Sequence, residues 1–511
     1  MSTNRQVGIA TLIWAASNLL SRIIGLVREA VIGRTLGGGA DADVFWTSFV
    51  MPDFLNYLLA GGALSIVFIP IFAQYLQNEN EEAGWQSFSM IFNALALMLL
   101  VVVPLLWIAT PLIVPSLGPG FDPQQLEQLT KLTRIILPAQ IFHLLGGMAS
   151  AALMAKDQHK IPAITGLVYT SCIILGGLIA QNAEGFAYGV LAGSLLGPFL
   201  LPMIACHKMG MKWSLGVQFT HQDVRTYFWR SLPIMLGFSI IVFDDFMLKR
   251  LGSLQETGSV ATLQYAKTLM KVPIGIFGLA FGVAVYPKLS AFVAEGNLKD
   301  AHLLLMENIK RVLFLALGAQ VTMSCVGADL ATVIYGGRLM EGQATDIGMC
   351  LVLMCIGLWG WAIQTIMARG FYARGNTWLP TILGSIVTVL AYPVYVLLEQ
   401  KYGIYGLAGA SAVAISVYVI VLEHFLAKSF DGNSGGLWLF LAKMMLAVLV
   451  ALMVGYPLMT YLPIDMPLLR IPIISAIVGM VYVLMTMSLK IPEIQAVQKD
   501  LSGKILRRLH R

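Results

Sequence analysis

Apolar runs of membrane-crossing length follow one another along almost the whole chain. A helix needs about 20 predominantly apolar residues to cross a bilayer. Polar clusters, glycines and prolines divide the chain into about fourteen such runs. Their approximate limits are 8–33, 44–75, 87–115, 131–155, 161–181, 186–206, 229–251, 262–294, 309–337, 345–369, 379–400, 404–427, 437–461 and 467–489. The pattern predicts an all-α polytopic membrane protein with about fourteen transmembrane helices.

Composition agrees with this prediction. The 511 residues are 58% apolar and 12% charged, with a mean hydropathy of +0.78, whereas soluble domains carry about 25% charged residues. The five cysteines and seven histidines show neither CxxC nor HExxH spacing, so we expect no metal site and no cofactor. The net charge of +6 lies largely in loops and the tail, which indicates membrane orientation rather than a nucleic-acid partner.

Lysines and arginines are unevenly divided between alternate loops. The side that includes both termini carries more than twice as many as the other side. Because such residues are retained in the cytoplasm, we expect both termini there. The tail, residues 490–511, also contains Ile505, Leu506 and Leu509 among its basic residues. It is either an amphipathic helix on the anionic inner leaflet or a positive tail without a specific role.

The two halves of the chain resemble each other. Pro162 precedes Gly185 by the same interval as Pro380 precedes Gly403, in similar surroundings. Residues 1–210 and 225–428 would then be two pseudo-symmetric six-helix lobes around a central cavity. Residues 437–489 would form two additional helices. Chance similarity between helices rich in Gly, Ala and Leu is the alternative.

The first apolar run contains unusually costly charges. A guanidinium at the bilayer centre costs roughly 2.5–3.5 kcal/mol on insertion scales, so Arg22 near the middle of this run predicts function. Arg28 lies about 120° around a regular helix from it, and the two share a face only if the helix bends at Gly25. By spacing, Glu29 shares a face with Arg22, and Ser21 with Arg28. The alternatives are a buried structural pair for Arg22 and snorkelling for Arg28.

The second run predicts an interrupted helix. It begins at Asp43, and it contains Pro52 and Asp53 before the glycine pair 61–62. Backbone groups released at such a break are tolerated in a membrane only beside protein or a water-filled cavity.

The seventh and eighth runs also combine charged residues with a proline that can interrupt a helix. Asp244 and Asp245 fall in the middle of one run, and because they are adjacent, we expect at most one to face a cavity. Lys267 and Lys271 share a helical face just before Pro273, a further candidate hinge. A buried carboxylate could pair with a lysine, bind a cation or carry a proton. The lysines could instead be an interfacial anchor pair.

Basic and acidic residues lie at mid-membrane depth beside helices that Pro and Gly can interrupt. This combination is typical of a protein that moves an anionic cargo by alternating access. An organic-cation exporter should show net acidic charge there, which Arg22 and Arg28 oppose. A membrane enzyme is expected to gather acids or histidines in an interfacial loop, and the sequence shows no such cluster.

Several motifs resemble the MurJ/MviN family of lipid II flippases. They include Ser21-Arg22-Ile-Ile-Gly25-Leu-Val-Arg28-Glu29, Ala40-Asp-Ala-Asp43-Val-Phe45, Pro273-Ile-Gly275-Ile-Phe277-Gly278 and Phe371-Tyr372-Ala-Arg374. The resemblance covers about residues 8–428 and implies the multidrug/oligosaccharidyl-lipid/polysaccharide exporter fold. It implies a multi-pass protein of the bacterial cytoplasmic (inner) membrane. Such a protein moves lipid II, the undecaprenyl-pyrophosphate-linked peptidoglycan precursor, to the outer leaflet.

The resemblance also assigns residues to roles. Arg22 and Arg28 correspond to family arginines of the first helix, Glu29 to its acid, and Asp43 to an aspartate at the external end. A family arginine of the second helix falls on Asn56 here.

Another family arginine falls near Thr268, where Lys267 and Lys271 could replace its charge. A sodium site of some relatives could match Asp244 or Asp245, although the eleventh run has no Asp or Asn. That absence argues against the sodium site of these relatives. We expect transport to be coupled to the membrane potential or to a monovalent cation.

Arg22, Arg28, Lys267 and Lys271 are thus predicted to hold the pyrophosphate. The predicted partners are lipid II or a related polyprenyl-pyrophosphate glycolipid, membrane lipids and cell-wall synthesis proteins. The alternatives are a flippase for another polyprenyl-linked glycan, a drug exporter of the same fold, a membrane glycosyltransferase and a cell-wall scaffold.

Overall fold

The computed structural model describes residues 23–60, 67–236, 240–275, 279–430, 432 and 435–491. Within these ranges the regular structure is entirely helical, which confirms the all-α prediction. Ser21 and Arg22 lie outside the described residues, as do the glycine pair 61–62 and nearly all of the tail.

Eight of the described helices are long and apolar enough to cross a membrane, or nine if the bent pair α16 (Gln343–Cys355) and α17 (Leu358–Ala373) counts as one span. The chain is therefore a multi-pass membrane protein. The longest helix, α18 (Trp378–Ser429), contains two predicted runs, and Gly403 between them is non-helical, with φ 57° and ψ −133°. The number fourteen stays a prediction.

The helices form two compact units. The first comprises Met1–Ala261 and Ile334–Met340, and the second comprises Thr262–Val333 and Glu341–Arg511. The predicted lobes are a division by sequence repeat rather than by contact, and their limits stay predictions.

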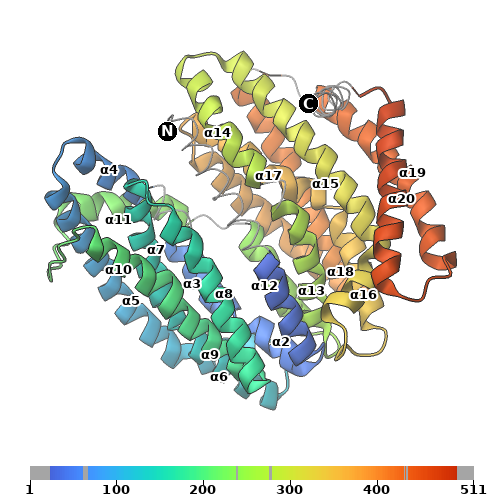
Figure 1. Ribbon diagram of the computed structural model, residues 1–511, viewed down its shortest axis with the longest axis horizontal. Coiled ribbons are helices and arrows are strands. Elements are labelled where there is room, and N and C mark those ends of the chain that lie inside the picture. Colours follow the sequence, from blue (N-terminus) through green and yellow to red (C-terminus); the bar gives the residue numbers. More distant parts are fainter. Residues whose placement is uncertain are drawn as a thin grey trace, which may run out of the picture. The chain divides into compact units, whose positions relative to one another are not determined.

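The first unit contains a helix at residues 23–36 and the helices up to α12, which Figure 1 shows in blue to green. They are α2 (Ala40–Thr47), α3 (Val50–Ala60), α4 (Ile69–Gln77), α5 (Glu81–Leu117), α6 (Pro123–Ile136), α7 (Ala139–Ala155), α8 (Lys160–Ala180), α9 (Ala183–Ser194), the π-helix Leu195–Leu200, α10 (Leu201–Lys208), α11 (Gln222–Leu236) and α12 (Ile240–Gly252).

Aromatic residues organise one end of the first unit. Phe72, Trp85, Phe88 and Phe92 form a row along α4 and α5 in which successive ring centroids lie 5.0–5.7 Å apart. All four side chains are buried. We call these four residues the aromatic row. It fixes the start of α5, where the helix enters its apolar part.

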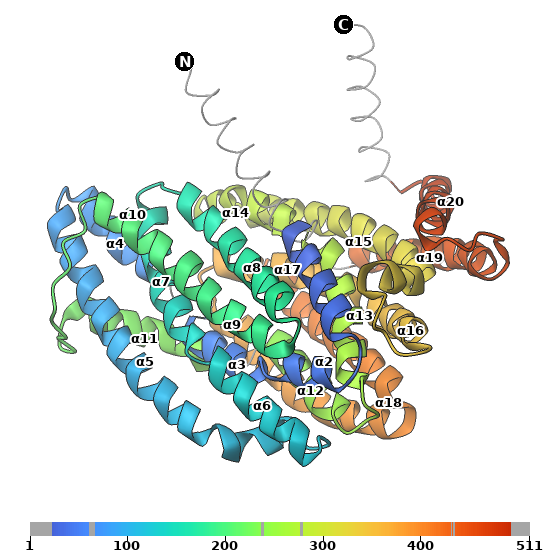
Figure 2. The same cartoon turned by 60° about the horizontal axis from the view of Figure 1, so that its bottom comes forward.

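The second unit contains the rest of the chain. Its helices are most of α13 (Ser259–Pro273), then α14 (Leu279–Ala294), α15 (Leu298–Tyr335) except for its last two residues, α16, α17, α18, α19 (Gly435–Tyr461) and α20 (Pro467–Ser488). The last two pack against each other as a hairpin (Figure 2). Arg470 donates from Nε to Asp329 Oδ2 at 2.7 Å, and Tyr482 donates to the Phe314 carbonyl at 2.7 Å. These bonds attach α20 to α15.

Candidate substrate-transport site

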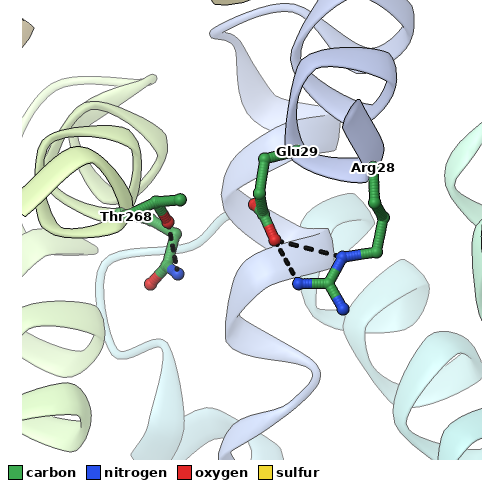
Figure 3. A network of polar contacts seen from close by, with 4 residues as sticks. Arg28, Glu29 and Thr268 are labelled. Atoms are coloured by element: carbon green, nitrogen blue, oxygen red, sulfur yellow. Dashed lines mark hydrogen bonds and ion pairs between the residues drawn. The ribbon is translucent and has the colours of Figure 1, made fainter. Parts of the chain in front are cut away.

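Arg28 is paired with its sequence neighbour Glu29. The guanidinium donates to Glu29 Oε1 through Nε, at 3.1 Å, and through Nη2 (Figure 3). Glu29 is 5% exposed, and its second oxygen, Oε2, is buried without a hydrogen-bond partner among the described residues. The arginine compensates the buried charge of this carboxylate, and removing one member of a buried pair lowers the stability of a protein by about 3–5 kcal/mol.

Helical spacing does not predict the contact between Arg28 and Glu29. Residues seven apart share a face, which suggested Glu29 with Arg22 and Ser21 with Arg28. Adjacent residues do not face each other on a helix, but the long arginine side chain turns across to reach Glu29. Gly25 lies inside the helix at residues 23–36, and a Cβ added there would meet nothing within 4 Å. A bend toward Arg22 falls outside the described residues.

Asp43 holds the start of α13. Its Oδ2 accepts the backbone N–H of Gly258 at 2.6 Å, and its Oδ1 accepts that of Ala261 at 2.7 Å. The first N–H groups of a helix lack partners within the helix, and a carboxylate is a favourable acceptor for them. Gly258 has a φ of +93°, a conformation that glycine adopts readily. The aspartate is 2% exposed, so it acts here as a buried cap.

A second set of contacts lies at the end of the helix at residues 23–36. Arg34 Nε donates to the carbonyl of Ile334 at 3.2 Å, and Arg338 Nη1 donates to the carbonyl of Thr35 at 2.6 Å. Arg34 thus binds a terminal carbonyl of α15, and Arg338, in the turn after α15, binds a terminal carbonyl of the helix at residues 23–36. A cation is favoured at such a helix end by the helix dipole. Gly33 packs against the fully buried Tyr335 at the same place. We call this pair of contacts the helix-end clamp.

Removing one arginine of the clamp is expected to loosen it. In Arg338→Ala the Thr35 carbonyl loses a charged donor, a bond of about 1.5–3 kcal/mol, so amide exchange at residues 34–38 should accelerate by at least about tenfold. Hydrogen–deuterium exchange measures this. Arg311→Ala is the matched control, because Arg311 forms an exposed pair with Glu307 at 3.6 Å and exposed pairs contribute little. Equal exchange in both variants would show that the clamp does not hold the helix ends.

Asp53 and Asp245 line one cavity of about 550 Å³. Its walls come from α3, α5 and α12 and are mostly apolar. Lys249, one helical turn after Asp245, lines it as well and is 6% exposed. Asp244 is fully buried and does not line this cavity. The adjacent aspartates therefore have different surroundings, as adjacent positions on a helix require.

Lys267 and Lys271 also have different surroundings. Lys267 is 1% exposed, and its ammonium lies 5.7 Å from the ring centroid of Trp361 on α17, within cation–π range. Lys271 is exposed near the end of α13. The exposed ammonium is the more accessible of the two for an anion, while Lys267 is embedded in the second unit.

The positions at which family arginines are replaced are both polar and partly buried. Asn56 is half-buried on α3. Thr268 on α13 accepts a hydrogen bond from Gln264 Nε2 at 3.5 Å (Figure 3). Neither side chain carries a charge, so a cationic role at these two positions is absent.

The two prolines among the candidate hinges lie at helix boundaries. Pro52 lies in the first turn of α3, directly after the break at residues 48–49 that separates α2 from α3. Pro273 ends α13, and π-helical residues follow it. A proline removes one backbone donor and fixes its φ, which explains why each lies at an end.

Sequence reasoning missed a polar group in the first unit. Ser194 donates its hydroxyl to the Val190 carbonyl at 2.6 Å and lies 2.9 Å from His143 Nε2. The direction of this contact depends on which imidazole nitrogen carries the proton. The imidazole packs edge-on against Tyr169, at 4.9 Å between centroids. Single polar residues within apolar runs were the available signal.

The chain matches the family model of the lipid II flippase MurJ over residues 32–465. It is 26% identical over 413 residues to a probable lipid II flippase MurJ of Rhizobium tropici, covering 78% of this chain and 76% of that protein. It is 25% identical over 474 residues to a probable lipid II flippase MurJ of Haemophilus influenzae, covering 87% and 91%. A lipid II flippase MurJ of Burkholderia cenocepacia is 25% identical over 418 residues, covering 79% and 81%.

Solved structures share the fold. A lipid II flippase MurJ in an inward closed conformation has a TM-score of 0.76 at 22% identity, covering 92% of this chain and 98% of that one. An inward-facing multidrug resistance MATE family transporter of the MOP superfamily has a TM-score of 0.67 at 14% identity, covering 82% and 98%. The family model spans most of the chain, from the first described helix to the loop before α20. The chain therefore belongs to the lipid II flippase MurJ family.

Proposed function

We propose that this chain is a lipid II flippase, which moves the lipid-linked peptidoglycan precursor from the inner to the outer leaflet of the bacterial cytoplasmic membrane. The observation that carries the proposal is the Arg28–Glu29 pair, with one buried carboxylate oxygen lacking a partner among the described residues, in a chain that matches the family over residues 32–465. A charged pair in an apolar span is costly and is typical of a substrate pathway.

The chemistry of the pair suits a pyrophosphate cargo. Guanidinium groups bind phosphate oxygens through two parallel hydrogen bonds, and they stay charged when buried. Glu29 Oε1 accepts from two of the three guanidinium nitrogens of Arg28, Nε and Nη2. The pyrophosphate would compete with Glu29 for these donors, so Glu29 keeps Arg28 oriented between cargo molecules. Arg22, Lys267 and Lys271 stay the further cations that the sequence predicts for pyrophosphate binding.

Alternating access is the proposed mechanism. The Asp43 bonds to the start of α13 and the helix-end clamp lie at helix ends that positive-inside counting assigns to the external side. We propose that these contacts form in one state of the cycle and break in the other. The chain's part would be binding and conformational change without covalent chemistry.

The membrane potential is the proposed energy source. An inside-negative potential favours outward movement of negative charge by about 2.3 kcal/mol per charge per 100 mV. A monovalent cation at Asp53 and Asp245 is a second candidate, because these two carboxylates line one cavity.

Depletion of the protein tests the function in cells. We expect lipid II to accumulate in the inner leaflet, with synthesis of lipid II itself unaffected. The measurement is the fraction of labelled lipid II accessible to an impermeant reagent added outside spheroplasts. Loss of total lipid II would indicate a glycosyltransferase, and unchanged accessibility would contradict transport. A different accumulating polyprenyl-linked glycan would identify another cargo.

A further inference from the structure

The segment that joins α10 to α11 is fastened to the side of α5. Residues 211–218 have no regular secondary structure. The Asn93 amide nitrogen donates to the carbonyls of Ser214, at 2.8 Å, and Gly216, at 2.9 Å, and the Trp213 indole N–H donates to Asn93 Oδ1 at 2.9 Å. The Ser214 N–H donates to Ser89 Oγ at 3.4 Å. Asn93 thus uses both polar atoms of its side chain to hold this segment, which we call the linker (residues 211–219).

The linker also extends the aromatic row. The Trp213 ring lies edge-on to Phe92, with 5.8 Å between centroids. Edge-on aromatic pairs add about 0.5–1.5 kcal/mol beyond the area they bury. The linker therefore has a fixed place beside α5 instead of crossing the surface as a loose loop.

Apolar side chains occupy every second position of the linker. Trp213, Leu215, Val217 and Phe219 are 53%, 93%, 40% and 59% exposed. In an extended chain alternate side chains lie on the same face, and carbonyls two residues apart point to the same side. The shared contact of the Ser214 and Gly216 carbonyls with one amide fits that geometry. Four large apolar side chains in one continuous exposed stretch indicate a surface that is covered in use.

The surroundings of the linker are basic. Four exposed cations lie in or beside it, namely Lys208, Lys212, Arg225 and Arg230. Lys212 pairs with Glu82 at 2.8 Å, and Trp229 on α11 is 64% exposed. Cations and tryptophans around an apolar surface are typical of the lipid headgroup region.

The linker is continuous with the lipid-facing side of α5. Leu97, one helical turn after Asn93, is 44% exposed, and exposed Leu100, Val101 and Leu105 follow. This part of α5 belongs to a candidate membrane span. The linker therefore lies at the level where the lipid-facing surface begins, and its basic side chains complement anionic headgroups.

We propose that the linker is a membrane-surface anchor. Leu215, Val217 and Phe219 insert into the interfacial region of the leaflet at this end of the helices. Lys208, Arg225 and Arg230 bind anionic phosphate headgroups. The anchor holds the connection between α10 and α11 at the membrane surface while the helices on either side change their contacts during transport.

Photocrosslinking in nanodiscs of phosphatidylethanolamine and phosphatidylglycerol tests this proposal. Benzoylphenylalanine in place of Leu215 should form phospholipid adducts about tenfold more often than the same residue in place of Gln218. The proposal buries the side chain at position 215 in lipid and not that at position 218, and burying a large apolar side chain is worth more than one factor of ten. Gln218 is the matched control, since it is an exposed polar residue of the same segment and falls between the apolar positions of the alternation. Adducts with a second copy of the chain, or equal yields at both positions, would overturn the proposal.

The lipid composition tests the electrostatic part separately. In nanodiscs of phosphatidylcholine alone, the yield at position 215 should fall about fivefold for each headgroup contact that is lost. A spin label on Leu215→Cys should collide with oxygen more often than with a water-soluble nickel complex. Cys172→Ser is the background, because the other four cysteines are buried. An unchanged yield in phosphatidylcholine would refute the role of the cations, and a water-exposed label would refute insertion.

Discussion

Replacing Arg28 by alanine is expected to abolish flipping. The variant loses the group proposed to bind the pyrophosphate, and it leaves the Glu29 carboxylate buried without its partner. The second effect costs about 3–5 kcal/mol. Flipping of fluorescent lipid II should therefore fall to the level of empty vesicles, and the amount of inserted protein should also decrease.

A double variant separates these two effects. Arg28→Ala combined with Glu29→Gln removes the unpaired charge, so the amount of folded protein should recover while flipping stays absent. Glu29→Gln alone tests orientation, because Arg28 remains charged and loses its anionic partner. Recovery of flipping in the double variant would show that Arg28 is a structural counter-ion and would remove it from the binding site. Arg28→Lys should flip slowly, since an ammonium does not reproduce the two-point contact of a guanidinium.

Replacing Asp43 by asparagine is expected to shift the conformational equilibrium. The carboxylate accepts two backbone N–H groups, one on each oxygen. An asparagine amide has one oxygen, so one buried N–H would face an NH₂ group and lose its bond. Leaving it unsatisfied costs about 1–3 kcal/mol. A loss of about 2 kcal/mol changes a two-state ratio by roughly thirtyfold.

Distances between spin labels at Glu127 and Glu256 measure this shift. Both residues are exposed at the end of the helices where Asp43 lies. The variant should increase the population with the longer distance. Asp41→Asn is the control, because Asp41 is exposed and accepts one bond, from Gln128 at 2.9 Å, which an asparagine can keep. Unchanged distance distributions in Asp43→Asn would mean that these bonds do not select a state.

The helical fold could be predicted because the bilayer restricts the options. Apolar runs long enough to span it must be helices, and the separation of two such runs within α18 could be placed near Gly403 from the sequence alone. The division of the helices into two compact units could not be predicted from the sequence. α12 belongs with the first unit because α3 and α5 pack against it, and spacing within a run does not give its neighbours.

Candidate site residues could be found from their cost, but their partners could not. Arg28 and Glu29 were identified as expensive residues, but helical periodicity gave no sign of their mutual contact because it ignores side-chain length. The faces predicted to join Glu29 with Arg22 and Arg28 with Ser21 involve residues outside the described ranges. Asp43 was selected as an aspartate at the external end, and nothing in the sequence indicated that it caps a helix beginning more than two hundred residues later. Arg34 and Arg338 were not selected at all, since the carbonyls they bind are exposed only where two helices end.

Reconstitution tests most directly whether this chain moves lipid II across a bilayer and whether Arg28 is required. Vesicles containing the purified chain and fluorescent lipid II are treated with an impermeant quencher from outside. The account predicts that lipid II of the inner leaflet becomes accessible at a rate that requires Arg28, while a labelled phospholipid of the same vesicles does not cross. Equal accessibility in vesicles with and without the chain, or equal rates with Arg28→Ala, would contradict it.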